Sequence, residues 1–437
     1  MSTAPPQART TRTPRAGGMF RALRHSNFRL FFVGAFLSNA GTWMQSVAQS
    51  WLVLQLTDSG TWLGVDTFVA TAPGLVLTLV GGVIADKVDR KRLLIYTQAG
   101  AGLSALALAA LVWAGAIRWQ GAARRPTDVW MVLVLSFVTG CCWAISGPSY
   151  QAITVDLVER EDLANAIALN SSQFQLARVA GPTLAAVTMK LLGMAGCFFA
   201  NGLSYAAIVA ALSRVSFERR GGAPAAAEKA GKAEAARRSM RNDLAEGFRY
   251  VRGRPRVGAV LLCSAVVCLF GSPYIVLLPL FARNVYGWDE AGLSLLMGTA
   301  GGGALVGALG LAYLGDVRRK GLILLAAMLS AGTCIVSFAS APSPRVAVPL
   351  LFLAGTSMVS FFALGNTLIQ QLVTDEMRGR VMSMWILTFI GTLPVSGFLS
   401  GAAADRFGPR PTLAACGLVV LLFGVATAFG NPRLREM

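Results

Sequence analysis

The stretch "WLGVDTFVATAPGLVLTLVGGVIADKVDRKRLL", residues 62–94, contains both features that decide the fold of this chain. Residues 62–85 carry a single charged side chain, Asp66, and are long enough to cross the ~30 Å hydrocarbon core of a membrane as a helix. Six charges then fall in the seven positions 86–92, and the sequence becomes apolar again. Long apolar segments separated by short charged ones are typical of a chain that crosses a bilayer repeatedly.

The composition supports the same interpretation over the whole chain. Hydrophobic residues make up 54% of the 437 positions and charged residues 14%, whereas soluble domains contain ~25% charged residues. We therefore expect an all-α polytopic membrane protein with twelve transmembrane helices in two six-helix bundles. The predicted spans are 28–56, 62–85, 93–117, 129–150, 165–189, 195–214, 257–281, 292–315, 321–340, 347–369, 381–403 and 411–430.

The distribution of basic residues predicts how the chain lies in the membrane. Most of the 39 Lys and Arg residues fall in the two tails and in every second loop, above all in 87–92 and 214–256. Basic residues in short loops resist translocation, so both termini are expected in the cytoplasm. The net charge of +18 is then explained by cytoplasmic loops next to anionic lipid, and we expect no nucleic-acid partner.

The sequence lacks the residues that several functional classes of protein need. The Arg-rich tail, residues 1–26, has no cleavage site of the kind that ends a signal peptide. All seven cysteines fall inside apolar spans, and the single histidine, His25, lies in the tail, so neither a disulfide framework nor a zinc site is indicated. We find no catalytic constellation and no phosphate-binding glycine motif. We therefore expect no enzyme activity, no cofactor and no bound metal.

The chain divides into two related parts. A polar stretch separates two sets of six spans and ends in a candidate surface helix, "RNDLAEGFRYVRGRPR" (241–256). "ADKVDRKRLL" (85–94) resembles "GDVRRKGLIL" (315–324), which indicates a parallel repeat, and many transporters place their substrate site between such repeats. The predicted boundaries are a cytoplasmic tail at 1–26, bundles at 27–214 and 257–430, a cytoplasmic linker at 215–256 and a second tail at 431–437.

The charged loop resembles the signature loop of the major facilitator superfamily, in which Gly82 and Asp86 match and Lys87 stands where arginine is usual. Three segments, 27–57, 147–182 and 244–252, resemble the drug-antiporter-like branch called transmembrane secretion effectors, and the resemblance extends over about residues 19–430. It implies a monomeric secondary transporter of a bacterial inner membrane that exports a small, largely apolar, siderophore-like or drug-like solute by alternating access, with protons as candidate coupling ions. An importer or uniporter with the same fold is the alternative, because direction is not written in the sequence.

The resemblance also implies a cytoplasmic gate. Asp86 would lie against the N-terminus of span eleven, where a helix stabilises an anion, and the repeat places Asp316 likewise at the start of span five. Opposite charges in the flanking loops would join the two halves, although basic residues here also serve as a membrane anchor. The candidate gate residues are Gly82, Asp86, Lys87, Arg90, Lys91, Arg92, Glu159, Glu161, Asp162, Asp316, Arg318, Arg319, Asp375 and Glu376.

Polar and aromatic residues at helical spacing indicate a substrate cavity lined by spans one, four, ten and eleven. Such residues also bond to neighbouring helices in membranes, which is the alternative for each of them. The candidates are Asn39, Thr42, Trp43 and Ser46 in span one, Trp143 and Tyr150 in span four, Ser357 and Ser360 in span ten, and Trp385 and Thr388 in span eleven.

Two charges inside predicted spans complete the candidates. A charge at the centre of a membrane helix costs ~2.5–3.5 kcal/mol on insertion scales, so it needs a partner or a wet cavity. Asp66, one turn into span two, is either a coupling residue or an interface residue that reaches water. Arg178, midway along span five, would bind an anionic part of the cargo or pair with a carboxylate; the alternative is a structural bond to backbone carbonyls.

Overall fold

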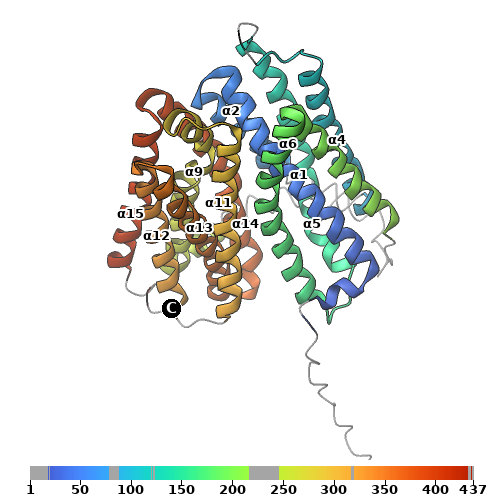
Figure 1. Ribbon diagram of the computed structural model, residues 1–437. Coiled ribbons are helices and arrows are strands. Elements are labelled where there is room, and N and C mark those ends of the chain that lie inside the picture. The colour runs from blue at the N-terminus through green and yellow to red at the C-terminus, as the bar shows by residue number, and fades with distance from the viewer. Residues whose placement is uncertain are drawn as a thin grey trace, which may run out of the picture.

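The computed structural model describes residues 18, 20–77, 88–119, 121, 124–215, 246–315, 319–431 and 435 (Figure 1). Within these ranges the regular structure is entirely helical. By length and composition, nine helices of the described part could cross a membrane: Arg90–Trp113, Pro126–Asp156, Leu163–Arg214, Pro255–Val285, Glu290–Leu314, Lys320–Ser340, Pro344–Leu372, Asp375–Phe407 and Pro409–Gly430. The fold is that of an all-helical polytopic membrane protein.

The first half of the chain, residues 20–215, begins with a short 3₁₀ helix. Its elements are η1 (Arg21–Arg24), α1 (Ser26–Thr57), α2 (Gly60–Thr71), α4 (Arg90–Trp113), η3 (Pro126–Asp128), α5 (Val129–Asp156) and α6 (Leu163–Arg214). α4 begins where it does because the Asp89 carboxylate accepts hydrogen bonds from the backbone N–H groups of Lys91 (2.8 Å) and Arg92 (3.2 Å). This is the usual way in which an aspartate caps a helix N-terminus.

The 52-residue α6 consists of two arms that reverse direction at Gly193. Gly193 has φ +69°, a left-handed conformation that glycine adopts without steric cost. Both arms pack against the same part of α1, because a Cβ added to Gly181 would meet Trp43, and one added to Gly41 would meet Asn201. The two arms match the predicted spans 165–189 and 195–214.

The second half, residues 246–431, contains a broken helix followed by five long ones. The elements are α8 (Pro255–Val266), η4 (Val267–Gly271), α9 (Pro273–Val276), α10 (Leu278–Leu280), η5 (Phe281–Val285), α11 (Glu290–Leu314), α12 (Lys320–Ser340), α13 (Pro344–Leu372), α14 (Asp375–Phe407) and α15 (Pro409–Gly430). We expected one regular helix over 257–281. Instead, η4 and η5 are π-helical. Pro273, which begins α9, and Pro279, which lies in α10, lack a backbone N–H and interrupt the regular hydrogen bonding.

Figure 1 shows the first-half helices (blue to green) grouped beside the second-half helices (yellow to red). The two groups meet chiefly where α2 packs on α14 and where α6 packs on α11. We call the side where α1 and α14 begin the basic end, because of its Lys and Arg residues. The side where α1 and α14 end, and where α2 begins, is the far end.

Candidate transport site and gates

A seam of glycines joins the two halves at the far end. A Cβ added to Gly64 would lie 2.3 Å from the Gly397 carbonyl oxygen, and one added to Gly401 would lie 2.1 Å from the Gly60 carbonyl oxygen. Real Cβ contacts are never this short, so only glycine fits. The backbones of α2 and α14 are therefore in direct contact, as small residues allow for membrane helices.

A carboxylate from the second half caps α2 beside this seam. Asp405, near the end of α14, accepts hydrogen bonds from Thr61 N (2.9 Å), Thr61 Oγ1 (2.6 Å), Gly60 N and Ser59 Oγ. Ser59 is the N-cap residue of α2, but its own side chain caps no backbone group. The N-terminus of α2 thus binds an anion supplied across the interface, where the helix dipole and the open N–H groups favour negative charge.

An ion pair reinforces the same end. The guanidinium of Arg283, in η5, pairs with the Asp58 carboxylate and donates to the Leu54 carbonyl oxygen (3.2 Å) at the end of α1. We refer to Asp58, Ser59, Gly60, Thr61, Arg283 and Asp405 as the far-end latch. The sequence analysis missed it. One signal was present, since "ADRFGPR" (404–410) repeats the order of "ADKVDRK" (85–91), an aspartate at a helix end followed by basic residues.

At the basic end, the first-half acidic residues bind partners of their own half. Asp162 contacts Arg21 Nε (2.5 Å) and His25 Nε2 (2.8 Å), and Glu161 lies 3.4 Å from Arg21. Glu161 and Asp162 are predicted gate residues, whereas Arg21 and His25 belong to the tail, to which the sequence analysis gave no role. Through these four residues η1 docks against the start of α6. The tail thus occupies the acidic loop for which second-half arginines were expected.

The basic residues that begin α4 also bind within the first half. Arg90 pairs with Asp156 (3.3 Å) at the end of α5. Lys91 Nζ donates to the carbonyl oxygens of Ser213 (2.9 Å) and Val215 (2.7 Å), which end α6. Arg92 is exposed at the surface. These contacts fasten the ends of three helices to one another.

The second-half gate residues behave in the same way where the structure describes them. Asp375 pairs with Arg378 (2.5 Å) one helical turn away, Arg380 pairs with Glu246 (2.7 Å), and Lys320 donates to Gln371 (3.1 Å). Glu159 and Glu376 are exposed, and Arg319 precedes α12 in a left-handed conformation. Five predicted gate residues lie outside the described ranges: Gly82, Asp86, Lys87, Asp316 and Arg318.

Arg178 lies at a junction of helices from both halves. Its guanidinium sits 5.2 Å from the centre of the Trp43 ring on α1, a cation–π contact, and it also contacts the Tyr274 hydroxyl on α9. A Cβ added to Gly301 on α11 would lie 2.6 Å from the Arg178 carbonyl oxygen, so the backbones are close there. Within the described residues, Arg178 forms no ion pair with a carboxylate.

Tyr274 is a site residue that the sequence analysis missed. It follows Pro273 in the broken helix of the second half and is buried. A proline inside an apolar span marks irregular backbone, and transporters build binding sites at such interruptions. That signal could have singled out Tyr274.

Asp66 is part of a hydrogen-bonded chain inside the first half. Gln49 Nε2 donates to both carboxylate oxygens (3.0 and 2.9 Å), and Ser136 Oγ donates to Oδ1 (2.6 Å). The chain continues from Gln49 to Gln45 (3.2 Å) and from there to Asn201 (2.6 Å). In the described part of the molecule, no Lys or Arg pairs with Asp66, so these neutral donors are what holds its carboxylate.

The other predicted cavity residues fall into two groups. Several bond within their own half: Asn39 to Gln173 (3.4 Å) and to the Tyr150 hydroxyl, Thr42 to the Tyr205 hydroxyl (3.2 Å), and Ser357 to Ser330 (2.8 Å). Trp385 is buried against Phe389 (5.2 Å between ring centres), and Thr388 donates to the Met384 carbonyl oxygen (3.0 Å). Partly or fully accessible candidates are Ser46, Trp143 and Ser360.

An all-helical membrane fold whose halves meet through an ion-paired, glycine-lined seam, with an arginine between them, is that of a membrane transporter. The chain belongs to the transmembrane secretion effector family of the major facilitator superfamily, whose family model matches residues 17–437.

Curated relatives match nearly the whole chain. It is 23% identical over 414 residues to the staphyloferrin A transporter of Staphylococcus aureus, covering 93% of this chain and 97% of that protein. It is 25% identical to the multidrug efflux pump Tap of Mycolicibacterium fortuitum, with 93% and 96% covered. It is also 25% identical to the enterobactin exporter EntS of Escherichia coli, with 94% and 93% covered.

Solved structures share the fold at low sequence identity. A bacterial homologue of the human lysosomal transporter Spinster superposes with a TM-score of 0.70 at 14% identity, covering 94% of this chain and 97% of the other. A D-xylose–proton symporter superposes with a TM-score of 0.71 at 11% identity, covering 94% and 99%. The fold of this chain is therefore the transporter fold of the superfamily.

Proposed function

We propose that this protein is an exporter that moves a small, largely apolar solute of the siderophore or drug kind across a bacterial inner membrane by alternating access. Its twelve spans would form two six-helix bundles, residues 27–214 and 257–430, joined by the linker 215–256, with both termini in the cytoplasm. The protein would work as a monomer. The basic end is then cytoplasmic and the far end is external.

The proposal rests on the positions of the contacts between the two halves. In the described part of the chain, the halves are joined at the far end by the far-end latch and at mid-depth by the Gln175–Ala304 hydrogen bond and the Arg178–Tyr274 contact. At the basic end, Arg21, Arg90 and Asp375 bind partners in their own halves. This is the arrangement expected of a transporter that is closed to the outside and open to the cytoplasm. The structure of the Spinster homologue is also inward-facing.

The cargo class rests on Arg178 and on the relatives. A guanidinium held between Trp43 and Tyr274, without a carboxylate partner among the described residues, would bind an anionic or electron-rich oxygen of the solute. The aromatic faces beside it would cover the apolar part. Two relatives are named for siderophores and one for multidrug efflux, which agrees with such a mixed site.

Asp66 is the candidate coupling residue. A carboxylate without a cationic partner is costly inside a membrane domain, and taking up a proton removes that cost. The hydrogen-bonded side chains of Gln49, Gln45 and Asn201 lie in line with it. We infer that protons are the coupling ions and that Asp66 binds and releases one per cycle.

Transport in membrane vesicles tests the proposal directly. Inside-out vesicles from cells that express the protein should accumulate a radiolabelled catecholate siderophore or a fluorescent lipophilic drug when a proton gradient is imposed. Collapsing the gradient with a protonophore should stop accumulation. An importer or uniporter would instead show counterflow in both vesicle orientations with no gradient-driven accumulation in inside-out vesicles, and that result would overturn the direction proposed here.

A further inference from the structure

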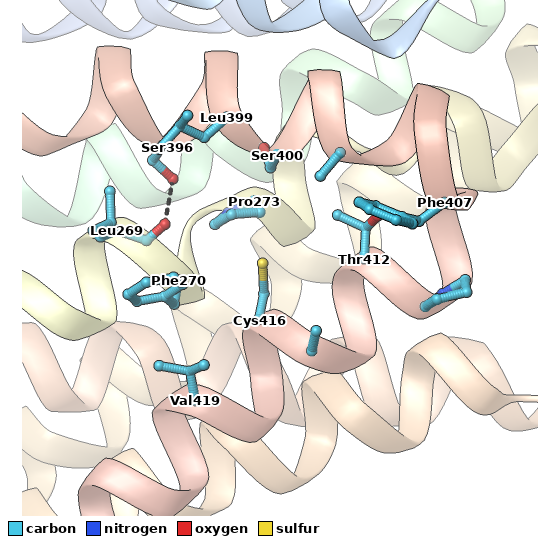
Figure 2. A pocket seen from close by; sticks show the side chains of 13 residues that line it. Leu269, Phe270, Pro273, Ser396, Leu399, Ser400, Phe407, Thr412, Cys416 and Val419 are labelled. Atoms are coloured by element: carbon cyan, nitrogen blue, oxygen red, sulfur yellow. Dashed lines mark hydrogen bonds between the residues drawn. The ribbon is translucent and has the colours of Figure 1, made fainter.

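An apolar crevice opens on the surface of the second half, away from the junction of the two halves (Figure 2). It has a volume of about 440 Å³ and lies among η4, α9, α14 and α15, within the ~300–1,000 Å³ range of small-molecule pockets. Leu399, Phe407 and Val419 form part of its wall and are exposed. The crevice is therefore open to the surroundings of the helices, which in a membrane are lipid.

Small side chains keep the crevice open. Ser400 on α14 and Cys416 on α15 lie on opposite sides of the crevice, with Pro273 between them (Figure 2), and Ala415 also lines it. Facing small residues usually let membrane helices pack closely. Here the broken helix holds the space open instead, because Ser396 of α14 donates to the Leu269 carbonyl oxygen of η4 (2.7 Å) and fixes that segment beside the gap.

One polar group in the crevice has no partner. Thr412 lines the crevice and is 6% exposed, and its Oγ1 is buried without a hydrogen bond. The hydroxyls of Ser396 and Ser400 already donate to backbone carbonyls. A water molecule needs two to four polar partners, which this apolar space does not offer. The unsatisfied hydroxyl therefore points to a ligand that is apolar along most of its length and carries an acceptor at the level of Thr412.

The far-end rim of the crevice is cationic. Arg406 places its guanidinium 5.4 Å from the centre of the Phe407 ring, and Phe407 forms the wall beside Thr412. From the far end inward, the crevice presents the Arg406 cation, then the Thr412 hydroxyl, then an apolar channel that extends to Val419. At 1.5 Å per helical residue, the channel from Thr412 to Val419 is about 10 Å long. A phospholipid has the same order: phosphate, ester carbonyl and acyl chain.

We propose that this crevice is a binding site for one phospholipid molecule. Its phosphate lies at Arg406, an ester carbonyl accepts a hydrogen bond from Thr412, and one acyl chain fills the space between α14 and α15 as far as Leu269 and Val419. Basic residues at a membrane surface favour anionic headgroups, so an anionic lipid binds more tightly than an uncharged one with the same chains.

Photocrosslinking tests this site. The purified, delipidated full-length protein in detergent is titrated with phosphatidylglycerol that carries a diazirine on one acyl chain, and labelled residues are located by mass spectrometry after illumination. A diacylglycerol with the same chain serves as the uncharged probe. We expect labelling near Phe270 and Cys416 that saturates at one lipid per protein, at lower concentration than labelling of exposed positions such as Leu422.

Four variants assign the contacts. Arg406→Gln and the isosteric Thr412→Val should each raise the half-saturating lipid concentration about fivefold, and Ala415→Phe should remove the saturable labelling by filling the crevice. Arg345→Gln removes a cation at the start of α13, outside the crevice, and should change nothing. The diacylglycerol should behave in the parent protein as phosphatidylglycerol does in Arg406→Gln. Labelling that never saturates, or that is the same in the parent, Arg406→Gln and Thr412→Val, overturns the proposal.

Discussion

Arg178 is the side chain on which the proposed function depends most. Its guanidinium stays charged at any physiological pH, and a charge at this depth is retained against a cost of several kcal/mol. The Trp43 ring and the Tyr274 hydroxyl account for part of that stabilisation. They come from different halves, so the environment of Arg178 must change whenever the halves move relative to each other.

We expect Arg178→Lys to lower the export rate about tenfold and Arg178→Met to abolish export. Lysine keeps the charge but loses the planar group that lies over Trp43 and reaches Tyr274, whereas methionine keeps only the length. Protein levels in the membrane should remain normal, as judged by immunoblot. Parental export by both variants at normal abundance would show that Arg178 has only a structural role.

A second residue-scale prediction concerns coupling. Asp66→Asn keeps the shape and one acceptor oxygen for Ser136 and Gln49, but its amide cannot exchange a proton. Export driven by a proton gradient should fall at least tenfold and should no longer respond to pH, while solute counterflow without a gradient should continue. The measurement is both assays in the same vesicles. Loss of counterflow together with driven export would instead assign Asp66 to folding or cargo binding.

At the scale of helices, the sequence predicted most of what is local. The charge-free length of each span and the charges beside it depend on neighbouring residues. The two arms of α6 and a helix following the charged loop could therefore be anticipated, although α4 begins three residues before the predicted span 93–117. The far-end latch could not, because Asp405 caps a helix that begins 345 positions earlier. The breaks at Pro273 and Pro279 lay inside an apolar run, and hydropathy does not distinguish a regular helix from an interrupted one.

The glycine seam gives an element-scale prediction. A methyl group at position 401 cannot be accommodated without moving α2 away from α14, since it would lie 2.1 Å from the Gly60 oxygen. Gly401→Ala should therefore reduce export at least tenfold by preventing far-end closure. Gly310→Ala on α11, where an added Cβ meets nothing within 4 Å, is the matched control and should export normally. Equal activity of the two variants would show that the seam need not close.

At the scale of the whole molecule, the contact between α2 and α14 includes an aspartate at a helix N-terminus at the far end. We expect a second aspartate at a helix N-terminus at the basic end. Asp405 of α14 caps α2 at the far end. From the resemblance to the superfamily we expect Asp86, which lies outside the described residues, to contact the start of α14. Under the proposed alternating access, one of these two caps forms as the other breaks.

Holding the far end closed should therefore stop transport. In a variant with Asp58→Cys and Arg283→Cys, a short bis-maleimide should link the halves where the ion pair now joins them. Export should be lost on linking, while the same reagent on either single-cysteine variant should have no effect. The readout is export per linked molecule, quantified by gel mobility after cleavage of the linker region between the halves. Export at the parental rate by fully linked protein would contradict alternating access at this end.

The cap on α2 also has a consequence for how the protein is made. The N–H groups of Gly60 and Thr61 receive their carboxylate from a residue synthesised 345 positions later. At ~5–20 residues per second, that delay is about 17–70 s. During this time the first half sits in the bilayer while the start of α2 lacks its final capping partner. Its insertion must therefore rely on contacts among its own helices, and the cap on α2 can form only once α14 has been made.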